Sequence, residues 1–129
     1  NMQALQTTYT GRDVIWLSIN SSAPGKQGNF TSKEILSRAK EYGAAFSAYL
    51  IDADGKVGKA YGARTTPHMF IIDPEGQLVY AGGIDNIRST DVDDVPRAKN
   101  FISQALDEAL AGQPITDSIS KAYGCSVKY

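Results

Sequence analysis

Cysteine and histidine are almost missing from this sequence, which contains one of each, Cys125 and His68, among its 129 residues. A single thiol cannot form an intrachain disulfide, and one cysteine with one histidine cannot make a structural zinc site. Basic and acidic residues nearly balance, at 13 and 14, so nothing favours binding to nucleic acid or to an anionic membrane. We expect no metal and no cofactor, and we expect small molecules or proteins as partners.

Long apolar runs are lacking as well. No stretch approaches the ~18 residues that would cross a bilayer, and the first residues lack the charged-then-apolar pattern of a signal peptide. Neither GxGxxG nor a Walker-type GKS or GKT occurs, so a nucleotide site is unsupported. Asp91, Asp93 and Asp94 could bind a cation, but acids in a loop before a helix are more often solvated or cap that helix.

What is present suits one globular domain spanning residues 1–129. Residues 14–19 are almost continuously apolar and β-rich, which predicts a strand covered on both faces, as in a parallel sheet. Thr31 and Glu34 have capping-box spacing and predict a helix of about three turns that ends near Gly43. The first part of the chain therefore alternates strand and helix.

The second part of the chain predicts a hairpin followed by a helix. Residues 69–72 and 78–80 are the two strands, because the Asp-Pro-Glu-Gly between them suits a tight turn. An apolar stripe from Pro96 to Leu110 predicts a surface helix capped by Asp93 or Asp94. Shorter elements are predicted at 2–8 (helix), 49–51 (extended), 52–55 (turn) and 57–61 (helical turn), and 113–129 is a mixed polar tail. This order is typical of an α/β fold with mixed strand directions.

Pro67 stands directly before the first hairpin strand, where a proline cannot donate to a ladder. A cis peptide bond after Thr66 explains the position, because cis proline is usually kept for a tight turn. Such a turn would leave the backbone of Thr66 available to pair with an extended segment beside it.

The stretch "GKVGKAYGARTTPHMFIIDPEGQLVYAGGID" resembles the second half of the thioredoxin fold in the redoxin group, which includes peroxiredoxins (AhpC/TSA) and TlpA/ResA-like proteins. "NMQALQTTYTGRDVIWLSINSS" resembles the end of that family's first helix and the following strand, and "YGCSVKY" resembles the closing stretch of one redoxin subgroup. The resemblance covers residues 1 to about 111 and implies an α/β thioredoxin-like fold, a mixed sheet with flanking helices that is incomplete at its N-terminus.

The reactive cysteine of this family stands at the start of the first helix, which the resemblance places before Asn1. The family's strand before that cysteine lies between the strand at 14–19 and the hairpin, whose ladder groups would otherwise be unpaired. We therefore expect an upstream βα unit of roughly 40 to 60 residues, or a strand from another chain in its place.

The resemblance also implies roles for three residues. Pro67 would be a wall that aligns a substrate peptide or thiol beside the active cysteine, and Thr66 would be the matching backbone contact. Cys125 would be a resolving thiol, with Lys121 and Lys128 nearby in sequence, although an incidental tail thiol is the alternative. His68 could tune a neighbouring thiolate, but a lone histidine at a strand start is more often structural.

These inferences favour a thiol-disulfide oxidoreductase or thiol peroxidase that acts on a thiol/disulfide protein or a peroxide. The chain by itself would be inactive, since Cys125 has no second thiol. The alternatives are a thioredoxin-fold peptide-binding module without a redox cysteine and a stable proteolytic remnant. The resemblance favours a location in the bacterial periplasm or cell envelope, and a strand-sharing homodimer is a further possibility.

Overall fold

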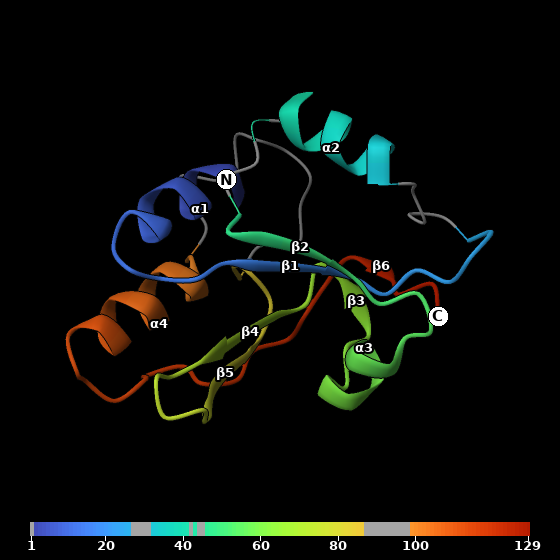
Figure 1. Cartoon of the computed structure of the whole chain (residues 1–129). Helices are drawn as coiled ribbons and strands as arrows, with labels where there is room; N and C mark the ends of the chain where they lie inside the picture. The colour runs from blue at the N-terminus through green and yellow to red at the C-terminus, as the bar shows by residue number, and fades with distance from the viewer. Residues whose placement is uncertain (1, 27–31, 42, 44–45, 87–98) are drawn as a thin grey trace. The chain divides into compact units, whose positions relative to one another are not determined.

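A computed structural model of the chain describes residues 2–26, 32–41, 43, 46–86 and 99–129. The chain divides into two compact units, one formed by residues 1–63 with 127–129 and the other by residues 64–126. Figure 1 shows their helices and strands.

The first unit alternates helices and strands. Its strands β1 (Leu17–Asn20) and β2 (Ala48–Ile51) pair in parallel, with Leu17 opposite Ala48. Its helices are α1 (Met2–Thr10), α2 (Ser32–Glu41) and α3 (Lys56–Tyr61). The predicted helix at the start of the chain, the extended segment before residue 52 and the helical turn after it are all confirmed.

The first strand differs from the prediction. It begins at Leu17. The N–H of Val14 bonds instead to the carbonyl of Tyr9 at the end of α1, and the N–H of Trp16 bonds to Oγ of Ser47 at 2.9 Å. Leu17 and Ile19 are 50% and 43% exposed, so the expected cover on both faces is not met by the described residues. β1 also pairs with only one strand among them.

The second unit contains the predicted hairpin, β4 (Met69–Ile72) with β5 (Leu78–Gly82), and a second antiparallel pair, β3 (Thr65–Thr66) with β6 (Cys125–Ser126). The hairpin is confirmed, whereas β6 lies in the tail, for which we had predicted no strand. Figure 1 shows the tail in red, running along β5 before it reaches β6.

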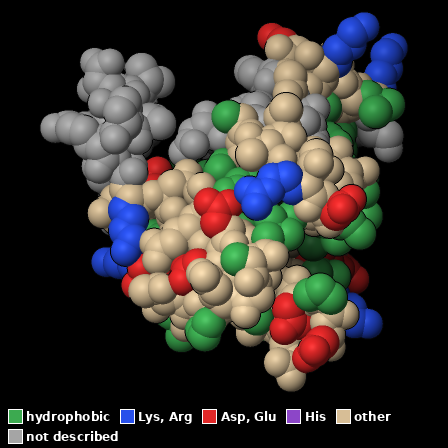
Figure 2. Space-filling view, turned by 90° about the vertical axis from the view of Figure 1, so that its left-hand side faces the viewer, with side chains coloured by type: hydrophobic (Ala, Val, Ile, Leu, Met, Phe, Trp, Pro, Cys, Tyr) green, Lys and Arg blue, Asp and Glu red, His purple; other side chains and the backbone are tan. Residues whose placement is uncertain are grey.

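Helix α4 (Phe101–Leu110) supplies much of the buried apolar surface of this unit through Ile102, Ala105 and Leu106. Burial of each large aliphatic side chain favours folding by about 1.5–3 kcal/mol. On the face drawn in Figure 2, hydrophobic side chains at the surface occur in separate groups among charged and polar ones.

The predicted start of this helix at Pro96 is wrong. The cap is Asn100, whose Oδ1 accepts the backbone N–H of Ser103 at 2.8 Å. Lys99 and Asn100 are not helical: Asn100 forms an antiparallel bridge with Asp85, and Phe101 donates its N–H to the carbonyl of Ile84 at 3.0 Å. The predicted caps Asp93 and Asp94, with Pro96, lie outside the described residues, as does Thr31 of the predicted capping box.

Candidate functional site

Strand β3 ends at the Thr66–Pro67 peptide bond, which is cis. The side chain of Thr65 closes this turn, since its Oγ1 donates to the carbonyl oxygen of Pro67 at 2.9 Å. Beyond the turn the chain continues into β4, so Pro67 lies between two short strands. The backbone of β3 just before this turn can therefore pair with a segment that lies alongside it.

The segment that runs beside β3 is the chain's own tail. β6 pairs antiparallel with β3, which places Cys125 opposite Thr66 and Ser126 opposite Thr65. Residues opposite each other in such a ladder have Cβ atoms about 4.5–5.5 Å apart, with both side chains on the same face. The structure thus brings together the three predicted site residues, Thr66, Pro67 and Cys125, which are far apart in the sequence.

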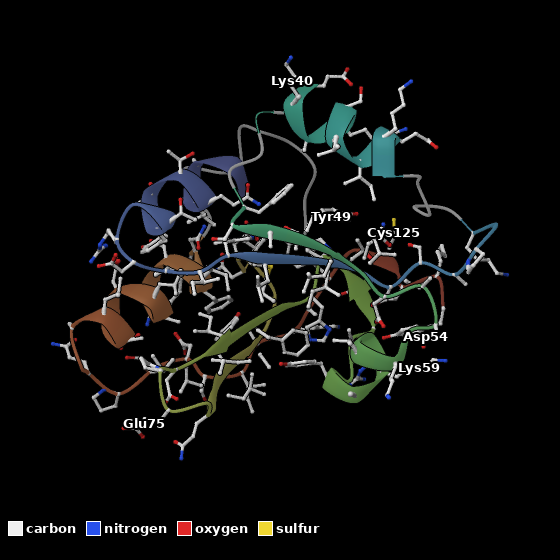
Figure 3. All side chains as sticks on the ribbon, in the orientation of Figure 1. Lys40, Tyr49, Asp54, Lys59, Glu75 and Cys125 are labelled. Atoms are coloured by element: carbon white, nitrogen blue, oxygen red, sulfur yellow. The ribbon has the colours of Figure 1, made fainter. Side chains whose placement is uncertain are left out.

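Cys125 is exposed on this short strand, and Figure 3 labels it there with its sulfur in yellow. It is the chain's only cysteine, so the thiol has no intrachain partner for a disulfide. An exposed thiol on the same face as the residue before Pro67 could meet a sulfur atom of another segment or molecule that reaches this turn.

Gly124 allows β6 to lie close to β3. A Cβ atom at this position would overlap the carbonyl oxygen of Thr66 and would lie 3.4 Å from the nitrogen of Pro67. Its φ of 138° is also one that L side chains rarely adopt. The tail is therefore in contact with the Thr66–Pro67 peptide unit itself, and a residue with a side chain at Gly124 would disturb that contact.

The tail is also fastened along β5, several residues before β6. Ala81 donates its N–H to the carbonyl of Ser118 at 3.0 Å and accepts the N–H of Ser120 at 3.2 Å. The hydroxyl of Ser120 lies 2.6 Å from that of Tyr80 and accepts the N–H of Gly83 at 3.0 Å. Because Tyr80 is almost fully buried, the tail is bonded to the interior of its unit as well as to its surface.

Tyr123 provides a second anchor, since its hydroxyl donates to Oδ1 of the buried Asp85. Partial burial, together with the hydrogen bond and the negative charge of Asp85, raises the pKa of Tyr123 to about 12. The protonated phenol is thus the form that the folded tail favours.

His68, next to Pro67, has structural contacts. Its Nδ1 accepts the backbone N–H of Arg64 at 3.2 Å, and its ring stacks on Phe70 with the centroids 4.6 Å apart. Partial burial, and then the nearby charge of Arg64, lower the pKa of His68, which favours the neutral imidazole. These contacts favour the structural role over thiolate tuning.

Asp52 is a buried acid in the first unit, and its oxygens are used to hold α3. It accepts the hydroxyl of Ser21 at 2.6 Å and the N–H groups of Val57 and Gly58 at 3.1 and 2.8 Å. Burial alone would raise the pKa of Asp52, but these hydrogen bonds outweigh burial and hold the pKa below its usual value. Asp52 thus stabilises the start of a short helix.

Neither a metal cluster nor a membrane span is found in the part of the chain that the structure describes. No three His, Cys, Asp or Glu side chains come together there to hold a metal ion. Among the same residues, no helix is both long and apolar enough to cross a membrane. The acids Asp91, Asp93 and Asp94 lie outside the described residues.

Comparisons with known proteins agree with this architecture. The family model described as Redoxin matches residues 2–102, which include Thr66 and Pro67 but not Cys125. A crystal structure of a hypothetical protein from Sinorhizobium meliloti 1021 is similar with a TM-score of 0.82 and 30% identity, covering 98% of this chain and 68% of that one. The crystal structure of an uncharacterized conserved protein from Geobacillus kaustophilus is similar with a TM-score of 0.86 and 30% sequence identity. The match covers 99% of this chain and 66% of that one. No curated protein matches the chain significantly.

Proposed function

This chain belongs to the Redoxin family and has a thioredoxin-like fold, and we propose that it is the substrate-positioning part of a thiol-disulfide oxidoreductase or thiol peroxidase. Family membership indicates a thiol-dependent redox function at a coarse level. The observation that carries the finer proposal is the pairing of Cys125 with Thr66, beside Pro67. A substrate-contacting turn and a thiol then share one face of one short ladder.

In this proposal the nucleophilic cysteine lies upstream of Asn1. Its thiolate attacks a peroxide oxygen, and the O–O bond breaks to give a sulfenic acid and an alcohol or water. The thiol of Cys125 then attacks the sulfenic sulfur, which forms a disulfide and releases water. With a disulfide substrate, the same thiolate attacks one sulfur, the substrate's S–S bond breaks, and one substrate thiolate leaves. A second thiol then attacks the mixed disulfide and releases the other substrate thiolate.

Three features support an upstream unit. β1 pairs with a single strand among the described residues, and a two-stranded sheet is marginally stable alone. Apolar side chains on β1 are about half exposed where a covering element would bury them. The chain also spans only 68% and 66% of its two solved relatives. An additional βα unit, or a strand from a second copy, would cover β1.

The test uses the protein expressed with the residues encoded before Asn1. If a cysteine precedes the first helix, treatment with hydrogen peroxide should remove two hydrogens from the intact mass and link that cysteine to Cys125. The Cys125→Ser variant should instead stop at the sulfenic acid, a gain of one oxygen, whereas Ser126→Ala, the neighbouring change, should behave as wild type. Absence of any upstream cysteine would contradict the enzymatic proposal.

A second candidate is a peptide-binding module of the same fold without a redox cysteine. The observation that favours it is that β3 does pair with an extended segment, although that segment belongs to the chain itself. Binding of an extended peptide at Thr66 by a full-length protein lacking the upstream cysteine would support this candidate.

A further inference from the structure

One edge of β3 is already occupied. β6 pairs with both residues of β3, and Gly124 approaches the carbonyl oxygen of Thr66 so closely that a Cβ atom there would overlap it. In a strand, an edge that has formed a ladder with one segment cannot form the same hydrogen bonds with another. A partner polypeptide that used this edge of β3 would therefore compete with the tail.

The occupying segment is held by several contacts that act together. Ser118 and Ser120 are bonded to Ala81, and Tyr123 is bonded to Asp85. Gly82 has the same kind of close approach as Gly124, since a Cβ there would overlap backbone atoms of Ser120. At both places where the tail passes very close to other backbone atoms, Gly82 on β5 and Gly124 in the tail, the residue is glycine. This indicates that the tail follows a specific path along this unit.

We propose that residues 118–126 are a built-in strap that closes the peptide-pairing edge of β3, so that the native site accepts a small oxidant and admits an extended polypeptide only after the strap is displaced. This inference rests on the proposed function in one respect, the role of the Thr66 edge in holding a substrate. It adds the substrate class: a low-molecular-weight peroxide or disulfide, which needs no strand pairing. The strap also keeps Cys125 beside Thr66.

The first test measures backbone hydrogen exchange in the chain, resolved to the fragments 64–68 and 123–127. Both fragments should be protected in the wild type, and both should exchange about tenfold faster in Gly124→Ala, where a Cβ meets the Thr66 carbonyl. Gly112→Ala is the matched control, because Gly112 also has a positive φ, of 71°, but open space around its Cβ position. That control should leave both fragments protected.

The second test measures binding of a fluorescein-labelled peptide spanning residues 117–128, with serine in place of Cys125. A closed edge lowers the apparent affinity by the fraction of molecules in which it is open. Gly124→Ala should therefore bind the peptide at least about tenfold more tightly than the wild type or Gly112→Ala. If Gly124→Ala fails to fold, Ser120→Ala supplies the comparison, because it removes the bonds to Tyr80 and Gly83 without a clash.

Two results would overturn the strap. One is wild-type protein that binds the peptide as tightly as the loosened variant does. The other is rapid exchange of the 64–68 and 123–127 fragments in wild-type protein whose β4–β5 hairpin is protected. Neither measurement involves thiol chemistry, so the strap can fail while the redox proposal stands.

Discussion

The β4–β5 hairpin and the β3–β6 pair are antiparallel ladders in the same compact unit, but they arise from different information in the sequence. The hairpin joins residues close along the chain, and its turn is marked by Asp73, whose Oδ1 accepts the N–H groups of Glu75 and Gln77 at 3.0 and 2.9 Å. The β3–β6 pair joins Thr66 to Cys125 across nearly the length of the unit. The turn residues between the two strands specify the β4–β5 hairpin, whereas the β3–β6 pair depends on contacts between residues far apart in the sequence.

Tyr80 is the residue where these two regions depend on each other, because it lies on β5 and its hydroxyl bonds to Ser120 of the tail. Tyr80→Ala should lower the free energy of unfolding by about 4 kcal/mol, since it removes a fully buried ring. Urea denaturation measures the loss. Leu78→Ala on the same strand, where the side chain is 52% exposed, should change stability far less. Equal losses in the two variants would contradict the central position of Tyr80.

The Tyr123→Phe variant tests whether the tail can be weakened without weakening the hairpin. It removes the hydrogen bond to Asp85 and should weaken the tail by about 1.5 kcal/mol, since Asp85 is buried and loses a donor. Hydrogen exchange should become faster in the fragment 123–127 while the hairpin stays protected. Faster exchange of the hairpin to the same extent would mean that the tail and hairpin open as one unit.

The Asp73→Ala variant is the converse test, because it should weaken the hairpin without weakening the tail. Loss of the two side-chain hydrogen bonds at the turn should destabilise the hairpin by about 1 kcal/mol, because the turn is exposed and water replaces the lost acceptor. Exchange in the fragment 69–82 should rise and that in the fragment 123–127 should not. Glu75→Ala, in the same turn, is the control. A larger increase in hydrogen exchange in the fragment 123–127 than in the fragment 69–82 would contradict the distinction between the two ladders.

The last prediction concerns alkaline pH. The pKa of Tyr123 is raised from 10.0 to about 12, so its contribution to stability is complete below pH 10 and is lost as the pH rises through 12. The difference in urea midpoint between wild type and Tyr123→Phe should therefore narrow between pH 10 and pH 12. A constant difference over that range would show that the Tyr123–Asp85 contact does not favour the protonated phenol.

Sequence reasoning succeeded where neighbouring residues determine the structure. The hairpin, the helical turn at α3 and the place of Thr66 and Pro67 before β4 all follow from local composition. The start of α4 was wrong because Asn100 and Phe101 bond to the segment at Ile84 and Asp85, which a helical stripe cannot reveal. β6 was missed because two residues beside a glycine carry no strand pattern, and only distant partners make them a strand.

The sequence also predicted the residues of the candidate site, Thr66, Pro67 and Cys125, but not that they lie side by side. The position of Pro67 before a strand predicted a turn after Thr66, and the resemblance to the redoxin group implied the roles of Thr66, Pro67 and Cys125. Their meeting depends on Ser120 and Tyr123, which bond to β5 and to Asp85 and have no motif of their own. A polar tail with alternating serines and a glycine before the cysteine is the weak signal that was present.

The most direct test of the account is whether Cys125 lies opposite Thr66 in solution. Opposite residues in an antiparallel ladder have Cα atoms about 4.5–5.5 Å apart, within the range of a disulfide. The Thr66→Cys variant should therefore form an intramolecular disulfide with Cys125 under mild oxidation, seen by intact mass and thiol titration, while Arg64→Cys should not. Two free thiols in oxidised Thr66→Cys, or only intermolecular crosslinks, would contradict the pairing on which the site and the strap depend.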